Sequence, residues 1–420
     1  MRTNQQYYSS VATLVARGLE GRVLAALADT PVVVVNGPRQ AGKTTLVRGL
    51  RYPGSSQLVT LDDPAARAAA AFDPRTFVDR SVDTFVIDEA QLEPGLFRAI
   101  KAAIDADRRP GRFLLTGSSR LMAAHDMADA LVGRVETLEL WPFAQRELAA
   151  RSGTFVDLVF DAPGALLHTS SWTRPSIVDL LVRGGFPEAV RRPLDRRRAW
   201  FDSYVATVTQ QVIRELADLN RAAEMPRLLR LCATRTATEL NATALGNDMG
   251  IPARTMGSYL AHLATAFLIR LIPAWSTNLS AKVVRRPKLV LADVGLAAHL
   301  LGVAGAALEQ GAALGPLLET LVATELIRQL TWSDVHATLW HFRDRGGAEV
   351  DLVLEHPDGR VVGIEVKASS TVRSEDFRGL RFLADRLGDR FAYGCLLTTA
   401  PEATPFGPRM AALSLASLWS

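Results

Sequence analysis

The chain has 420 residues, of which 48% are apolar and 22% charged, and its formal net charge is +4. This length allows two or three domains, and so small a charge does not by itself indicate nucleic-acid binding. The two cysteines, Cys232 and Cys395, lie far apart in apolar runs, which excludes a disulfide framework or a zinc site and favours a reducing cytoplasm. The first residues lack an apolar signal core, and the apolar stretch 289–308 contains Asp293 and His299, so we expect no membrane association.

Residues 31–150 alternate short apolar runs with helical stretches. Apolar runs without polar alternation suit strands covered on both faces, and their alternation with helices predicts a doubly wound parallel sheet of the α/β class. The predicted strands are 32–36, 57–63, 84–90, 112–118 and 135–140. We predict three domains along the chain: an ATPase domain with its linker, a helical middle domain and a C-terminal α/β domain, at 1–200, 201–300 and 301–420.

A phosphate-binding loop is predicted at "GPRQAGKT", residues 37–44, which follows a valine strand and opens an apolar helix. Its glycines allow backbone N–H groups to surround phosphate oxygens at the start of that helix. Lys43 is expected to reach the β- and γ-phosphates of ATP, and Thr44 to bind Mg²⁺. The predicted nucleotide-binding residues are Gly37, Pro38, Arg39, Gln40, Ala41, Gly42, Lys43, Thr44 and Thr45.

Polar residues follow two further predicted strands of this sheet. In "FVIDEAQ" (85–91), Asp88 is expected to hold Mg²⁺ and Glu89 to deprotonate the attacking water. In "FLLTGSS" (113–119), Thr116 or Ser118 is a candidate to sense the γ-phosphate. Arg134 in "LVGR" is either an arginine that acts on a neighbouring subunit's nucleotide or an ordinary surface residue.

Together these motifs resemble the AAA+ class of ATPases. Two further motifs, "GGFPEAV" (184–190) and "PKLVLADVGLAAHLLG" (287–302), extend the resemblance. With them the chain is similar to a bacterial and archaeal family that joins an AAA+ core to a C-terminal domain of unknown function. The resemblance covers most of the chain and implies ATP binding and hydrolysis. It departs from the family where an Arg-Asp pair is often found, because Gln211 and Val212 stand there.

The middle region contains "TALGNDMGIPARTMGSYLAHL" (243–263), which reads as a helix, a tight turn at Gly250 and a second helix. With strands near 268–274 and 288–292 this predicts a winged helix-turn-helix. The second helix could read DNA or could serve as a structural lid. Its candidate DNA-facing residues are Arg254, Thr255, Ser258 and His262.

Two basic runs, "RRPLDRRR" (191–198) and "AKVVRRPK" (281–288), could follow a phosphate backbone or form solvated faces.

The C-terminal region is predicted as a helix at 315–330, strands near 338–343, 349–354 and 361–367, a helix at 374–387 and a strand near 392–398. Glu365 and Lys367 are two residues apart in "IEVK" and therefore share a strand face, and Asp351 belongs to the preceding strand. Two carboxylates and an ammonium that converge in this way can bind Mg²⁺ and orient a water molecule, with Lys367 as the catalytic lysine. The pattern resembles the PD-(D/E)XK nuclease superfamily. That resemblance implies a further acid on the preceding helix, for which Glu319 is the first candidate and Glu325 the second.

The sequence therefore predicts an ATP- and Mg²⁺-dependent AAA+ ATPase whose nuclease-like domain engages nucleic acid, DNA rather than RNA, and which can form a homo-oligomer. Two alternatives remain at this point: a regulatory or DNA-binding ATPase whose nuclease-like domain does not cleave, and a protein-interaction switch.

Overall fold

The computed structural model describes residues 14–118, 131–215, 224–276, 286–344 and 346–420. The chain divides into two compact units. The first, here called the parallel-sheet unit, comprises Ala16–Pro142 and Thr265–Phe267, and the second, the C-terminal unit, is built mainly from Phe143–Ala264 and Leu268–Ser420. The three-domain division at 200 and 300 stays a prediction.

The parallel-sheet unit is a five-stranded, wholly parallel sheet in the order β2-β3-β4-β1-β5. Each predicted strand is present within a few residues of its expected bounds. The strands are β1 (Val32–Asn36), β2 (Ser56–Thr60), β3 (Thr84–Asp88), β4 (Phe113–Gly117) and β5 (Val135–Glu139). The helices are α2 (Glu20–Asp29), α3 (Lys43–Gly49), α4 (Pro64–Phe72), α5 (Pro74–Val78) and α6 (Leu96–Ala106), with a 3₁₀ turn, η1, at Ala90–Leu92.

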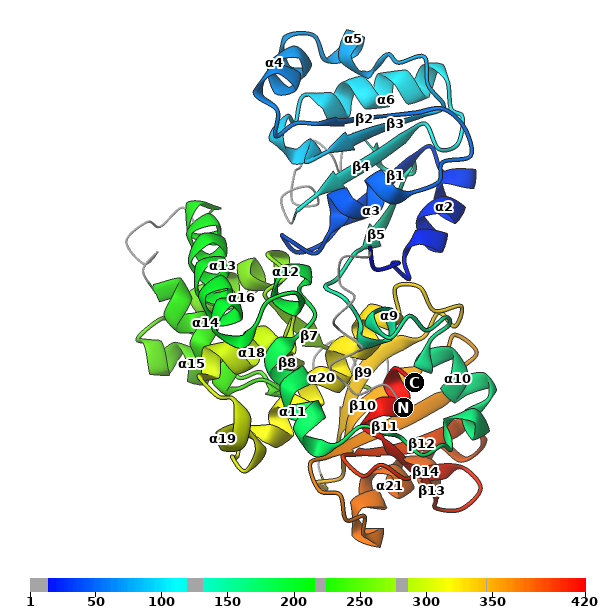
Figure 1. Cartoon of the computed structure of the whole chain (residues 1–420), viewed down its shortest axis with the longest axis vertical. Helices are drawn as coiled ribbons and strands as arrows, with labels where there is room; N and C mark the ends of the chain where they lie inside the picture. The colour runs from blue at the N-terminus through cyan, green and yellow to red at the C-terminus, as the bar shows by residue number, and fades with distance from the viewer. Residues whose placement is uncertain (1–13, 119–130, 216–223, 277–285, 345) are drawn as a thin grey trace. The chain divides into compact units, whose positions relative to one another are not determined.

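The four valines of β1 explain why helices cover both faces of this sheet. Val32 and Val34 belong to an apolar cluster with α5 and α6, whereas Val33 and Val35 belong to a second cluster with α2 and α3. Side chains alternate between the faces of a strand, so a run of buried valines requires cover on both sides. Figure 1 shows α6 on one face of the sheet and α3 on the other.

The C-terminal unit begins with helices that pack around one another. These are α9 (Gln145–Leu148), α10 (Phe155–Asp161), α11 (Arg174–Arg183), α12 (Pro187–Val190), α13 (Leu194–Glu215), α14 (Met225–Thr234), α15 (Ala242–Met249), α16 (Ala253–Thr265), α18 (Val294–Leu301) and α19 (Gly305–Glu309), with a 3₁₀ turn, η2, at Pro163–Leu166. A three-stranded antiparallel sheet joins β6 (Thr238–Glu239), β8 (Lys288–Leu291) and β7 (Ile269–Ile272) in that order.

The predicted helix–turn–helix is confirmed as local geometry. Helix α15 ends at Gly250, which has a φ of 67° and so adopts the left-handed conformation that glycine tolerates best. Pro252 accepts the N–H of Met256 and therefore stands just before α16. On α16, Arg254 and Ser258 are exposed. Thr255 and His262, the other two candidates for a DNA-facing surface, are only partly exposed.

The rest of the unit is a mixed six-stranded sheet, in the order β13-β14-β12-β11-β10-β9, with α20 and α21 packed against β11. Strands β9 to β11 are antiparallel neighbours, and β11, β12 and β14 are parallel (Figure 1). The bounds are α20 (Leu314–Gln329), β9 (Thr338–Arg343), β10 (Glu349–Glu355), β11 (Val361–Lys367), α21 (Arg378–Leu387), β12 (Phe391–Thr398), β13 (Thr404–Pro405) and β14 (Met410–Ser414), with 3₁₀ turns at Ser374–Phe377 (η4), Gly388–Arg390 (η5) and Leu415–Leu418 (η6).

A buried ionic network holds α20 in place. The guanidinium of Arg328, 1% exposed, contacts Asp293 at 2.9 Å and Glu325 at 3.1 Å, and it donates to the carbonyl of Phe143 at 2.9 Å. Asp293 also accepts the N–H of Gly185 at 2.8 Å. The network therefore joins "GGFPEAV", "PKLVLADVGL" and helix α20, three segments far apart in sequence.

Within the described part of the chain, no helix is long and apolar enough to cross a membrane. Cys232 and Cys395 are free and buried.

Candidate functional site

The phosphate-binding loop connects β1 to α3 and lies wholly in the parallel-sheet unit. Gly37 has no room for a side chain, because a Cβ there would lie 2.1 Å from the carbonyl oxygen of Leu140. Gly42 immediately precedes α3 with a φ of 96°, which favours glycine. Two of the four fixed positions of the motif, Gly37 and Gly42, thus suit glycine for reasons of local backbone geometry. Arg39 and Gln40 at the tip of the loop are exposed.

The third fixed position, Lys43, points back into the loop. Its amine donates to the carbonyl oxygens of Gly37 at 3.0 Å and Pro38 at 2.9 Å, and the residue is 5% exposed. Burial lowers the pKa of Lys43 to about 8, although the charges of Glu89 and Asp88 oppose this shift. A buried ammonium that donates to neutral carbonyl oxygens, as this one does in the described part of the chain, is electrostatically suited to receive an anion.

A hydroxyl–carboxylate pair lies at the start of α3 and the end of β3. The Thr44 hydroxyl is 3.0 Å from both carboxylate oxygens of Asp88 and donates to that group. The Thr116 hydroxyl, at the end of β4, also donates to Asp88. Hard oxygen donors of this kind are those that Mg²⁺ prefers, so the residues present fit the expected ion.

Glu89 follows Asp88 in a left-handed backbone conformation, with a φ of 57°. Its N–H donates to the Thr116 hydroxyl at 3.2 Å, and its carboxylate accepts a hydrogen bond from the amide of Gln91. The amide of Gln91 also lies 3.5 Å from the Ser118 hydroxyl. Gln91 had no predicted role, although it belongs to the quoted motif. Its position two residues after Glu89 is the only sequence signal for this contact.

Arg134 is engaged within its own chain. Its guanidinium contacts one carboxylate oxygen of Asp105 at 2.6 Å and 3.0 Å, and the carbonyl of Val132 at 3.2 Å. An action on a neighbouring subunit's nucleotide would require this ion pair to break, and it stays a prediction.

Three predicted acids and the predicted lysine of the C-terminal unit come together with one further lysine. This group, here called the acid–lysine cluster, comprises Glu319, Asp351, Glu365, Lys367 and Lys288. Strands β10 and β11 pair antiparallel, and the carboxylate of Asp351 accepts the N–H of Val366 at 2.9 Å. The amine of Lys367 donates to Glu365 at 2.8 Å.

Lys288 is the member that the sequence did not predict. From the first residue of β8, its amine donates to Glu319 and to the main-chain carbonyl of Asp351 at 3.0 Å, and it lies 3.6 Å from the Asp351 carboxylate. Burial, together with the charge of Asp351, raises the pKa values of Glu319 and Glu365, whereas the ammonium groups of Lys288 and Lys367 oppose these shifts.

Two expectations for this region need correction. Glu325, the second candidate for the helical acid, is not in the cluster: it accepts the N–H of Gln145 and pairs with Arg328 in the buried network. A metal group formed by Glu319, Asp351 and Glu365 is also not found among the described residues; the amines of Lys288 and Lys367 lie against these carboxylates instead.

The basic run 191–198 is only partly available to a ligand. Arg197 is buried and donates to the carbonyls of Ala189 and Arg192, and Arg192 pairs with Glu188. The exposed arginines of the run are Arg191, Arg196 and Arg198. Most of the second run, 281–288, lies outside the described residues.

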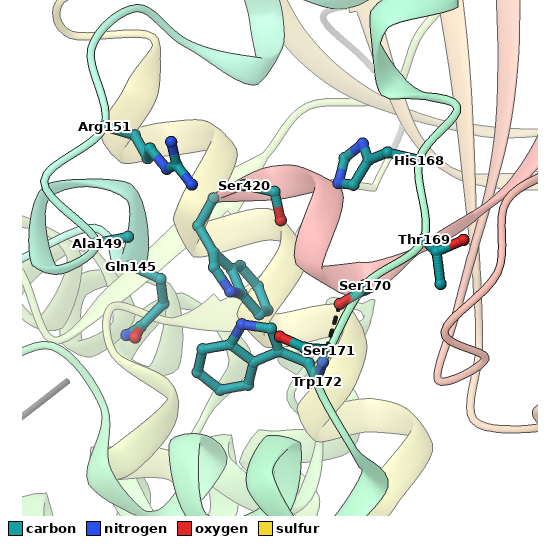
Figure 2. A pocket seen from close by; sticks show the side chains of 10 residues that line it. Gln145, Ala149, Arg151, His168, Thr169, Ser170, Ser171, Trp172 and Ser420 are labelled. Carbon is teal, nitrogen blue, oxygen red and sulfur yellow. Dashed lines mark hydrogen bonds between the residues drawn. The ribbon is translucent and has the colours of Figure 1, made fainter. Parts of the chain in front are cut away.

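A cavity of about 210 Å³ in the C-terminal unit contains none of the predicted site residues. Figure 2 shows Arg151, His168 and Ser420 around it. The main-chain N–H of Trp172 donates to the Ser170 hydroxyl at 3.1 Å. The indole of Trp172 meets that of Trp419 edge-on at a centroid distance of 5.3 Å. The cavity is therefore separate from the acid–lysine cluster.

Three parts of the chain match known families. Residues 29–149 match a family described as "AAA domain". Residues 174–307 and 314–418 match two families described as domains of unknown function (DUF8612 and DUF4143). Together with the phosphate-binding loop and the parallel sheet, the first match supports an AAA-type ATPase.

The sequence relatives carry names that state no activity. Uncharacterized proteins of Mycobacterium bovis and Mycobacterium tuberculosis are each 29% identical over 357 residues, covering 84% of this chain and 74% of theirs. Among solved structures, a Walker-type ATPase of Pyrococcus abyssi has a TM-score of 0.41 at 14% identity, covering 69% of this chain and 96% of that one. AMPPCP-bound DnaA of Aquifex aeolicus has a TM-score of 0.28 at 14% identity, covering 61% and 91%. Neither reaches 0.5, so the assignment rests on the AAA family match and the site itself.

Proposed function

We propose that the chain binds and hydrolyses ATP at the phosphate-binding loop. The observation that carries this proposal is the position of Lys43. In the described part of the chain its buried amine donates to the loop carbonyls of Gly37 and Pro38, next to a Thr44–Asp88 pair that suits Mg²⁺. The loop amides and Lys43 would hold the β- and γ-phosphates.

The roles of the remaining residues follow from their contacts. Thr44 and Asp88 would hold Mg²⁺, which when bound neutralises phosphate charge. Glu89 would accept a proton from the attacking water, and Gln91 positions its carboxylate. Thr116 bonds both Asp88 and the backbone of Glu89, so it holds the two acids in a fixed relation.

The test is the replacement of Lys43 by alanine. We expect ATP affinity to fall about 100-fold, since a charge-assisted contact of about 1.5–3 kcal/mol to the phosphates is lost. Fluorescent-ATP titration measures the change. Lys101→Ala is the matched control. Lys101 is an exposed lysine of α6, so its replacement should leave the ATP affinity unchanged. Normal ATP affinity in Lys43→Ala contradicts the proposal.

A second candidate function concerns the C-terminal unit. The order α20, β9–β11, α21 and β12, with Glu319, Asp351, Glu365 and Lys367 grouped at β10 and β11, favours a nuclease-like fold. The α15–α16 pair and the small antiparallel sheet after it similarly favour a winged helix. We infer that the C-terminal unit of this ATPase binds DNA. The position of Lys288 within the acid–lysine cluster favours binding without cleavage.

Incubation with DNA or RNA tests this inference. We expect salt-dependent DNA binding, because contacts to phosphates release counterions, and no cleavage with Mg²⁺ or Mn²⁺, with or without ATP. Gel shifts over a series of salt concentrations measure DNA binding, and analysis of the reaction products measures cleavage. Cleavage that disappears in Asp351→Ala and Lys367→Ala would instead establish an active nuclease. Failure to bind either nucleic acid would favour a protein-interaction switch.

A further inference from the structure

Lys288 has the surroundings of a bound cation. Its side chain is 10% exposed, and its amine is shared by a Glu319 carboxylate oxygen, the main-chain carbonyl of Asp351 and a carboxylate oxygen of Asp351. Carboxylate and carbonyl oxygens are also the ligands that a hard divalent cation takes in proteins. The ammonium thus occupies a set of oxygens that would otherwise suit a metal.

Little of the cluster remains available to an added ion. One oxygen of Asp351 accepts the Val366 N–H and the other faces Lys288, while one oxygen of Glu365 accepts Lys367. The second oxygen of Glu365 is the one atom of this cluster that is buried without a hydrogen-bond partner in the described part of the chain. Two ammonium groups already balance most of the charge of three carboxylates, so the Mg²⁺ expected from the sequence does not fit.

The charge on Lys288 is well supported by its neighbours. Burial disfavours the charged form, but Glu319 and Asp351 outweigh this effect, and the pKa of Lys288 lies above its ordinary value. The amine therefore stays protonated at neutral pH and competes with any external cation.

We propose that Lys288 is the resident cation of the acid–lysine cluster, so that the wild-type cluster binds no divalent ion, and that removing the ammonium creates a divalent-cation site at Glu319, Asp351 and Glu365. The same contacts tie β8 to α20 and β10, which lie in two different family-matched segments. The proposal depends on neither ATP hydrolysis nor nucleic-acid binding.

The test measures how many Mn²⁺ ions the full chain binds in the absence of nucleotide. The electron paramagnetic resonance signal of free Mn²⁺ falls as ions bind, and this loss gives the number bound. Lys288→Met keeps the length of the side chain and removes its charge. We expect it to bind one more Mn²⁺ than the wild type, with a dissociation constant of about 10⁻⁴ M or tighter, and to gain several degrees of melting temperature when Mn²⁺ is added. Lys288→Arg, which keeps the charge, should gain neither.

Glu365→Gln distinguishes Mn²⁺ bound at the acid–lysine cluster from Mn²⁺ bound at the Thr44–Asp88 pair. The extra ion of Lys288→Met should disappear in the double variant Lys288→Met/Glu365→Gln, whereas Mn²⁺ bound near the phosphate loop should remain. A folded Lys288→Met that gains no ion overturns the proposal. A wild-type protein that loses a bound Mn²⁺ on Glu365→Gln also overturns it. This last comparison decides the question even if Lys288→Met does not fold.

Discussion

Replacing Glu89 by glutamine is expected to slow ATP hydrolysis by about 100-fold or more while ATP still binds. The amide keeps the size of the side chain but cannot accept the proton of the attacking water. Because Lys43, Thr44 and Asp88 are unchanged, the contacts proposed for the phosphates and Mg²⁺ remain. Phosphate release under saturating ATP measures the rate, and fluorescent-ATP titration measures the affinity.

Glu93→Gln is the matched control for this experiment. Glu93 lies four residues further on, where its carboxylate accepts the N–H of Gly95 rather than a contact from Gln91 or Thr116. The same chemical change there should leave hydrolysis within about two-fold of the wild type. Unchanged hydrolysis in Glu89→Gln would remove Glu89 from the catalytic role. Loss of ATP affinity would show that Glu89 supports the loop instead.

The contrast between Glu89 and its neighbours shows what the sequence could and could not predict in the ATPase site. The loop and Asp88 were predictable, because glycine spacing and an acid after a buried strand are local signals. The left-handed conformation of Glu89 and its hydrogen bond to Thr116 were not, because Thr116 comes from another strand. The contact between Arg134 and Asp105 on α6 is likewise a matter of tertiary packing.

The same division applies to the C-terminal unit. Strands 338–343 and 361–367 were predicted with the observed bounds, since apolar runs between turn residues specify them locally. The amine of Lys288 contacts both Glu319 and Asp351, whereas Glu325 pairs with Arg328. Both glutamates are largely buried, so burial along the helix does not separate the two candidates. Lys288 was counted within a basic surface run. Only the pairing of β8 and the packing of α20 bring its amine to the cluster.

Replacing Arg328 by methionine is expected to be the most destabilising single change, at about 3–5 kcal/mol. Methionine fills much of the volume but leaves Asp293 and Glu325 buried without their common cation. Burial already raises the pKa of Glu325 to about 7, and loss of the guanidinium should raise it further, so that Glu325 takes up a proton. Urea denaturation followed by circular dichroism measures the loss.

Arg192→Met provides the matched control, because Arg192 pairs with Glu188 at 3.0 Å with both side chains partly exposed. A solvent-exposed pair contributes about 0–1 kcal/mol, so this change should be nearly neutral. Arg328→Met/Glu325→Met should recover part of the loss, since one of the two unpaired acids is removed. If Arg328→Met is no worse than Arg192→Met, the network is not what holds α20 against the segments around Gly185 and Asp293.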